Sequence, residues 1–237
     1  SYNDLELSEL AASMNKAAAQ LDDYDKEQKI FFQNVSHELR TPLQVIKCNA
    51  EGIEHGILDG QKSSGVILGE TDRLTEMVED LLYLSQIDNI KSSTQLDEYD
   101  LRELLSNCAE RQRALAVKRG ILFSFDFADW PVLFFCDEKR ISRAFANVLS
   151  NAIRYAKSKI YFVCRQENNR LIISIEDDGD GIPTEEMPHI FDRFYKGKDG
   201  KHGIGLAIVK SIIDMHNGKI EVENTAMGTR FTITFFK

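Results

Sequence analysis

Residues 171–183 decide the fold of the second half of the chain; they are Leu-Ile-Ile-Ser-Ile-Glu-Asp-Asp-Gly-Asp-Gly-Ile-Pro. The first six are rich in apolar and β-branched side chains, which predicts a strand. A similar run covers residues 160–165, and the Glu-Asn-Asn-Arg between the two runs is a hairpin signal. Glycines in the acidic turn that follows permit positive φ and close approach of the backbone to a ligand. A Ca²⁺ loop is the alternative, but the EF-hand spacing and its terminal Glu are missing.

Helical and strand patterns alternate around this hairpin. We expect helices over residues 100–119, 137–156 and 204–216, and further strands over residues 121–127, 219–223 and 229–236. That order predicts an α+β sandwich, in which a mixed sheet carries helices on one face. The periodic pattern stops around residues 88–98, where we expect a linker.

The first 90 residues show a different pattern, with apolar positions recurring at steps of three and four. Ile67, Leu74 and Leu81 are seven residues apart, and so are Met77 and Leu84, as in a heptad seam. The pattern predicts a long helix, a glycine-bearing break over residues 52–65 and a second helix of about 25 residues. Two helices cannot bury such stripes alone, so a homodimeric four-helix bundle is the economical solution.

Composition excludes several classes of protein. The 237 residues include 29 Lys and Arg against 38 Asp and Glu, a net charge of −9, which disfavours nucleic acid as a partner. No run of about 18 apolar residues occurs, so we expect no membrane-spanning segment within the chain. The four cysteines form no CxxC pair and have no histidine at metal spacing, so we expect them to be reduced and mostly buried.

A candidate nucleophile lies in residues 36–42, Ser-His-Glu-Leu-Arg-Thr-Pro. At 100° per residue, Val35 and Leu39 face the core, so His37 lies roughly opposite and faces solvent. Thr41 is four residues on and shares the face of His37. The alternative is an ordinary surface histidine.

Two further segments suggest a polyphosphate ligand. Asn147, Asn151 and Arg154 fall on one helical face, where they can hold a metal-bound polyphosphate; ordinary surface polarity is the alternative. Gly203 and Gly205 open an apolar helix, whose free N–H groups and positive dipole end favour phosphate. This segment is neither a Walker A sequence nor a GxGxxG fingerprint.

Taken together, these segments resemble the transmitter region of sensor histidine kinases. They occur in the family's order: phospho-acceptor, asparagine, acidic glycine, Phe-rich (residues 190–195) and second glycine motifs. Residues 4–21 also resemble the last helix of a HAMP-type relay domain. The resemblance implies a relay helix and connector over 1–25, a dimerisation and phosphotransfer hairpin over 26–92, and an ATP-binding domain over 93–237. It further implies that the chain is the cytoplasmic portion of a longer membrane receptor.

The resemblance implies a role for each matching residue. His37 would be the phospho-acceptor. Glu38 would hold or accept the proton on the other nitrogen of the imidazole ring, and Thr41 would position water for dephosphorylating a partner. The implied nucleotide-binding residues are Asn147, Asn151, Arg154, Tyr155, Asp177, Gly179, Gly181, Ile182, Phe194, Lys196, Gly203, Ile204, Gly205 and Leu206. Asn151, supported by Asn147, would ligate Mg²⁺, so ATP and Mg²⁺ are the implied cofactors. The implied partners are a second copy of the chain and the receiver domain of a response regulator.

Two other functions compete with a histidine kinase. The first is an ATPase of the chaperone or mismatch-repair type, which would leave the hairpin bearing His37 without a purpose. The second is a relay that no longer transfers phosphate, against which the intact Asn151, Asp177 and both glycine motifs argue.

Overall fold

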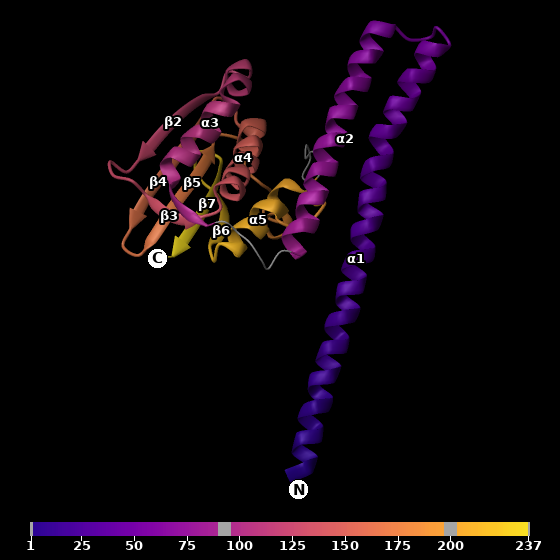
Figure 1. Cartoon of the computed structure of the whole chain (residues 1–237). Helices are drawn as coiled ribbons and strands as arrows, with labels where there is room; N and C mark the ends of the chain where they lie inside the picture. The colour runs from indigo at the N-terminus through magenta and orange to yellow at the C-terminus, as the bar shows by residue number, and fades with distance from the viewer. Residues whose placement is uncertain (1, 90–95, 197–202, 237) are drawn as a thin grey trace. The chain divides into compact units, whose positions relative to one another are not determined.

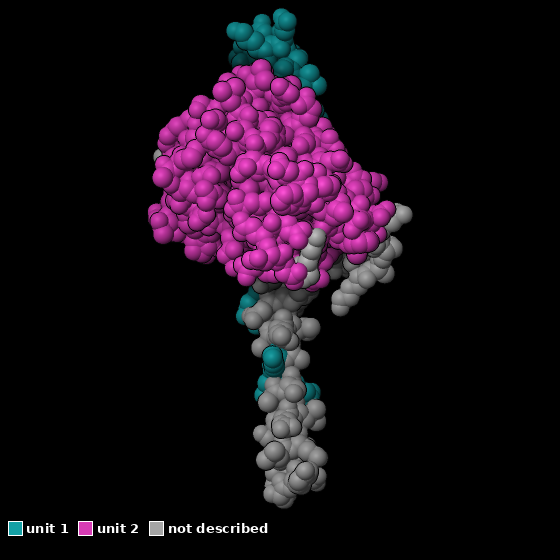
Figure 2. Space-filling view, turned by 90° about the vertical axis from the view of Figure 1, so that its left-hand side faces the viewer, with its two compact units in different colours: residues 1–77 teal, residues 78–237 magenta. Residues whose placement is uncertain are grey.

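The computed structural model describes residues 2–89, 96–196 and 203–236, and the chain divides into two compact units, residues 1–77 and 78–237 (Figure 2). Two helices dominate its first part, α1 over Tyr2–Glu54 and α2 over Gly60–Asn89 (Figure 1). Met77 and Leu84 are buried in α2, and Ile67, Leu74 and Leu81 are half-buried, so the expected seam lies on the less exposed side of this helix. Within the described residues, no helix is long and apolar enough to cross a membrane.

The break between the helices is shorter than the glycines suggested. It spans residues 55–59, whereas Gly52 lies inside α1 and Gly60 begins α2. Gly56 ends α1 with a φ of 68°, and the Asp59 carboxylate accepts the Lys62 N–H at 2.8 Å, which caps α2. Local capping therefore places the break, because scattered glycines alone do not end a helix that packing supports.

The second part is the expected α+β sandwich. Its five-stranded sheet has the order β2-β4-β5-β7-β6, in which β2 and β4 are parallel and the other pairs are antiparallel. The strands are β2 (Leu122–Phe127), β4 (Lys159–Glu167), β5 (Arg170–Asp177), β6 (Lys219–Asn224) and β7 (Thr229–Phe236). Helices α3 (Leu101–Lys118), α4 (Glu138–Tyr155) and α5 (Gly205–Met215) cover one face (Figure 1).

A small second sheet corrects the expected linker. Strand β1 (Asp97–Asp100) pairs with β3 (Leu133–Cys136), and α2 extends to residue 89. The first residues of the 88–98 segment are therefore helical and its last residues belong to a strand. The Asp100 carboxylate accepts the N–H groups of Arg102 and Val132, at 3.1 and 3.0 Å, and so fastens β1 to the start of α3 and to the chain before β3. Because this pairing joins segments more than 30 residues apart, local patterning missed it.

The core lies between the large sheet and its helices. Along β5, Leu171, Ile173, Ile175 and Asp177 alternate toward this core, and Phe162 of β4 and Phe235 of β7 are fully buried beside them. The last turns of α2 contact α4 within the second unit. There, Nη2 of Arg143 lies 2.6 Å from Oδ1 of Asp80, and its guanidinium stacks 3.8 Å from the Tyr83 ring centroid.

Candidate active site

The candidate phospho-acceptor lies on α1, in the first unit. His37 is exposed, while Val35 and Leu39 are half-buried, as the helical geometry predicted. The Thr41 hydroxyl lies one turn on, 3.4 Å from the backbone oxygen of His37, and is also exposed. Helix α1 continues through the buried Pro42. A nucleophilic ring and a hydroxyl therefore share one face that a substrate can reach.

The asparagine segment lies on α4, in the second unit. Asp137 caps this helix by accepting the Arg140 N–H at 3.1 Å, and apolar residues such as Val148 and Ala152 fix its inner face. Asn147, Asn151 and Arg154 are half-buried on the face between core and solvent. Nδ2 of Asn147 donates to the Gly205 carbonyl at 3.1 Å, which joins α4 to the start of α5.

Asp177 ends β5 and is 2 % exposed. Burial raises the pKa of its carboxyl group to about 6, against the opposing effect of hydrogen bonds from the N–H groups of Gly179 and Thr229. The Gly179 N–H lies 2.9 Å from Oδ1. A buried carboxylate held by two amides is a fixed acceptor, suited to an amine of a ligand.

The neighbouring Asp178 fastens the end of α4 to this loop. Its carboxylate accepts from the N–H groups of Lys157 and Ser158 and, at 2.6 Å, from the Ser158 hydroxyl. Partial burial acts to raise the pKa of Asp178, but these hydrogen bonds hold it well below its ordinary value. A Cβ on Gly179 would lie 2.6 Å from the backbone oxygen of Tyr155, so only glycine fits there. Tyr155 itself is exposed beside the loop.

The Phe-rich and second glycine segments meet directly. The Phe194 N–H donates to the Gly203 carbonyl at 2.7 Å, and Ile204 is buried just before α5 begins at Gly205. Lys196, two residues after Phe194, and Leu206, directly after Gly205, are half-buried. Residues 197–202 lie outside the described residues.

The fold thus links all four second-unit motifs through contacts: Asn147 with Gly205, Tyr155 with Gly179, and Phe194 with Gly203. Gly181 has a φ of 83°, and the next residue, Ile182, exchanges two hydrogen bonds with Asn224, its N–H donating at 2.9 Å and its carbonyl accepting at 2.8 Å. Sequence reasoning missed Asn224 and Thr229, which flank the turn between β6 and β7. The Gly228-Thr229 pair could have indicated this turn, because it places a glycine at the start of a predicted strand.

The donor set fits Mg²⁺. Asn147 uses its amide nitrogen toward Gly205, so its oxygen is available as a ligand, and Asn151 lies one helical turn further on. Among the described residues, no three His, Cys, Asp or Glu side chains gather as a metal cage. Mg²⁺ needs none, because it is commonly bound by one or two protein oxygens, water and substrate phosphates.

Comparison with known proteins gives two family matches. Residues 27–90 match the family described as His Kinase A (phospho-acceptor) domain, and residues 136–237 match the family described as histidine kinase-, DNA gyrase B-, and HSP90-like ATPase. The sensor histidine kinase CssS of Bacillus subtilis is 31 % identical over 232 residues, which are 96 % of this chain and 51 % of that protein.

Solved structures agree with these matches. The histidine kinase AdeS of Acinetobacter baumannii superposes with a TM-score of 0.73 and 28 % identity, over 84 % of this chain and 97 % of that one. The histidine kinase ThkA, solved in complex with the response regulator protein TrrA, has the same fold, with a TM-score of 0.76 at 24 % identity over 87 % of this chain and 61 % of that one. The chain spans about half the length of the curated relatives it matches.

Proposed function

Because the chain belongs to the sensor histidine kinase family, we propose that it phosphorylates itself on His37 with ATP and passes the phosphoryl group to an aspartate of a response regulator. The observation that carries this proposal is the hydrogen bond between Asn147 and Gly205, which brings the asparagine and second glycine segments together in the unit that also holds the buried Asp177. The same chain presents an exposed histidine on a helical hairpin.

The proposed nucleotide site divides the work among its segments. Asp177 accepts a hydrogen bond from the adenine amine, with Tyr155, Ile182 and Phe194 beside the base. Arg154, Lys196 and the N–H groups at the start of α5, from Gly203 to Leu206, meet phosphate oxygens. Asn151, with Asn147, would hold Mg²⁺, which neutralises phosphate charge when bound. A Cβ on Gly179 or Gly181 would lie 2.6 Å from the Tyr155 carbonyl or 3.0 Å from Oδ1 of Asn224, so the two glycines let the loop pack closely beside the proposed nucleotide.

In the transfer step, an imidazole nitrogen of His37 forms a bond to the γ-phosphorus as the bond to the ADP oxygen breaks. Glu38, adjacent on α1 and half-buried, takes the proton from the other nitrogen. Positioning and charge neutralisation supply most of the rate enhancement in such a reaction. In the reverse role, Thr41 positions water to dephosphorylate the regulator; its hydroxyl donates to the His37 carbonyl and is exposed, so its oxygen can still accept a hydrogen bond from that water.

The assembly we propose is a homodimer. Phe32 and Leu43 of α1 are 59 % and 53 % exposed, although they belong to the apolar stripes of the hairpin, and a second copy would cover them in a four-helix bundle. We also propose that the relay helix and connector end at residue 25 and that the phosphotransfer hairpin ends at residue 92. The chain would then be the cytoplasmic portion of a longer membrane receptor. The family and the complex of ThkA with a response regulator support a receiver domain as partner.

The decisive experiment incubates the purified chain with γ-labelled ATP and Mg²⁺. We expect label that survives alkali and is lost in acid, and that disappears in His37→Gln. His55→Gln is the matched control, because His55 is exposed in the turn after α1 and has no proposed role. Label that persists in His37→Gln would contradict the proposal. ATP hydrolysis without any phosphohistidine would favour the chaperone-type ATPase.

A further inference from the structure

The turn between β6 and β7, residues 224–229, lies against the proposed adenine loop at two places. Asn224 exchanges two hydrogen bonds with the backbone of Ile182. At the other end of the turn, the Thr229 N–H donates to the Asp177 carboxylate. A Cβ on Gly228 would lie 2.3 Å from the Asp177 carbonyl and 2.7 Å from the Gly179 nitrogen, so the turn is packed directly on the loop.

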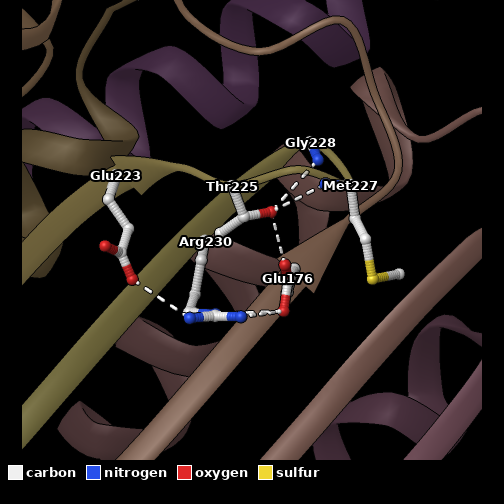
Figure 3. A network of polar contacts seen from close by, with 6 residues as sticks. All are labelled: Glu176, Glu223, Thr225, Met227, Gly228 and Arg230. Atoms are coloured by element: carbon white, nitrogen blue, oxygen red, sulfur yellow. Dashed lines mark hydrogen bonds and ion pairs between the residues drawn. The ribbon is translucent and has the colours of Figure 1, made fainter.

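The Thr225 hydroxyl organises this turn. It accepts the N–H groups of Met227 and Gly228 at 3.1 and 3.2 Å, and donates to Oε1 of Glu176 at 2.6 Å (Figure 3). The carboxylate therefore orients the hydroxyl, since a proton given to Glu176 leaves the lone pairs for the two amides. One carboxylate thus fixes the course of a turn on another part of the sheet.

Arg230 also holds Glu176 in place, through the second oxygen of the carboxylate. Its Oε2 accepts from Nε and Nη2 of Arg230 at 3.0 and 2.8 Å, and Arg230 also reaches Glu223 at 3.1 Å (Figure 3). Glu176, Arg230 and Glu223 lie directly opposite one another in the register of β5, β7 and β6. Glu176 is 7 % exposed, and a buried carboxylate is tolerated only when it is paired and hydrogen-bonded.

Neighbouring positions on β5 thus have complementary tasks. Side chains alternate across a strand, so Asp177 faces the helices and the proposed nucleotide, while Glu176 faces the opposite side of the sheet. Glu176 cannot touch a nucleotide bound at Asp177. It reaches that carboxylate through Thr225 and the turn, whose Thr229 N–H is one of the two amides that hold Asp177.

We propose that Glu176 and Thr225 are positioning residues for adenine recognition, acting through the β6–β7 turn on Asp177. The inference rests on the proposed nucleotide site. The polar relay from carboxylate to hydroxyl to turn amides fixes where the Asp177 oxygens lie, and so sets how well the site distinguishes an amine at position 6 of a purine from an oxygen.

The test compares Thr225→Val, which keeps the shape of the side chain and removes the hydroxyl, with Thr225→Ser, which restores it. Calorimetry measures the Kd for ADP and for inosine diphosphate, which has an oxygen where ADP has the amine. A hydrogen bond to a charged group contributes about 1.5–3 kcal/mol, so we expect Thr225→Val to lose roughly tenfold or more of its preference for ADP. Thr225→Ser should recover that preference, and Glu176→Gln should lose part of it.

Glu223→Gln serves as the matched control, because it removes the exposed ion pair of the same Arg230 and should leave the preference unchanged. If Thr225→Val loses affinity for ADP and for inosine diphosphate equally, so that the ratio of the two Kd values is unchanged, the inference is overturned and Thr225 has a purely structural role. Failure of the nucleotide site itself has a different signature: the unmodified chain would not prefer ADP, and Asp177→Asn would change nothing.

Discussion

Phe194 and Gly203 form a backbone bridge, in which the Phe194 N–H lies 2.7 Å from the Gly203 carbonyl and both residues have positive φ, 66° and 67°. A phenylalanine in this region is uncommon and costs energy, whereas glycine adopts it freely. The bridge closes the chain on both sides of residues 197–202 and so fixes the point where the second glycine segment enters α5.

This geometry predicts that Gly203→Ala abolishes nucleotide binding. The added Cβ would lie 2.4 Å from the Tyr195 carbonyl, and the left-handed backbone adds about 1–2 kcal/mol of strain. Calorimetry with ADP measures the effect. Gly65→Ala is the control, since its Cβ meets nothing within 4 Å in α2, and it should keep full affinity. Normal ADP binding by Gly203→Ala would refute this account of the bridge.

Removing the Asn151 amide should break the link between Mg²⁺ and nucleotide affinity. We expect the unmodified chain to bind ADP more tightly with Mg²⁺ than with EDTA, and Asn151→Ala to lose most of that difference. Asn107→Ala, on the exposed side of α3, is the control. An undiminished response to Mg²⁺ in Asn151→Ala would assign the metal to other residues.

Thr41 should separate the two proposed activities at His37. Thr41→Ala keeps the imidazole and its exposure, so autophosphorylation should stay within about twofold, while dephosphorylation of the regulator should fall by about 100-fold, as for a misplaced reactant. Thr41→Ser keeps the hydroxyl and should retain both activities. Autophosphorylation is measured with γ-labelled ATP, and dephosphorylation with a regulator that carries labelled phosphate. A parallel loss of kinase and phosphatase activity would contradict the separate role.

His216 predicts a pH dependence of stability. Its ring is buried, with Nδ1 lying 2.8 Å from the Ile212 carbonyl and Nε2 accepting the Asp137 N–H at 3.1 Å. Burial lowers its pKa, so the unfolded chain takes up a proton first as the pH falls below about 6.5, and the free energy of unfolding decreases.

Urea unfolding at pH 7.5 and 5.5 tests this prediction. The loss attributable to His216 is at most about 1.4 kcal/mol per pH unit. Asp177 acts in the opposite direction, because its raised pKa makes the folded chain bind more protons between about 4 and 6. The comparison is therefore with His216→Gln, whose amide oxygen can still accept the Asp137 N–H. The variant should lose less stability between the two pH values, and identical slopes would refute the prediction.

Local sequence pattern was enough for most of the fold. The helices α3, α4 and α5 and the strands β2, β4, β5, β6 and β7 all lie within two residues of their expected bounds. Their amphipathic periods match the faces that they bury, so propensity and packing agree. The exposure of His37 followed from helical geometry alone, because Val35 and Leu39 fix which side faces inward.

The site was less predictable than the elements around it. Motif order pointed to Asn147, Asp177 and Gly203 as members of the proposed site. It gave no indication of Glu176, Thr225 or Asn224, which contact the proposed adenine loop or the turn packed on it through strand register and turn geometry. In the printed sequence they are ordinary polar residues near a strand end.

The sequence by itself determined the two-part organisation, the order of most elements and the side of α1 that exposes His37, because each depends on the periodicity of neighbouring residues. Only the tertiary structure decided the β1–β3 sheet, the Phe194–Gly203 bridge and the position of Asp177 between two amides. Those features join segments distant in the chain. Sheet register and the burial of one carboxylate determine which residues pair in these features, and no local pattern in the sequence encodes either.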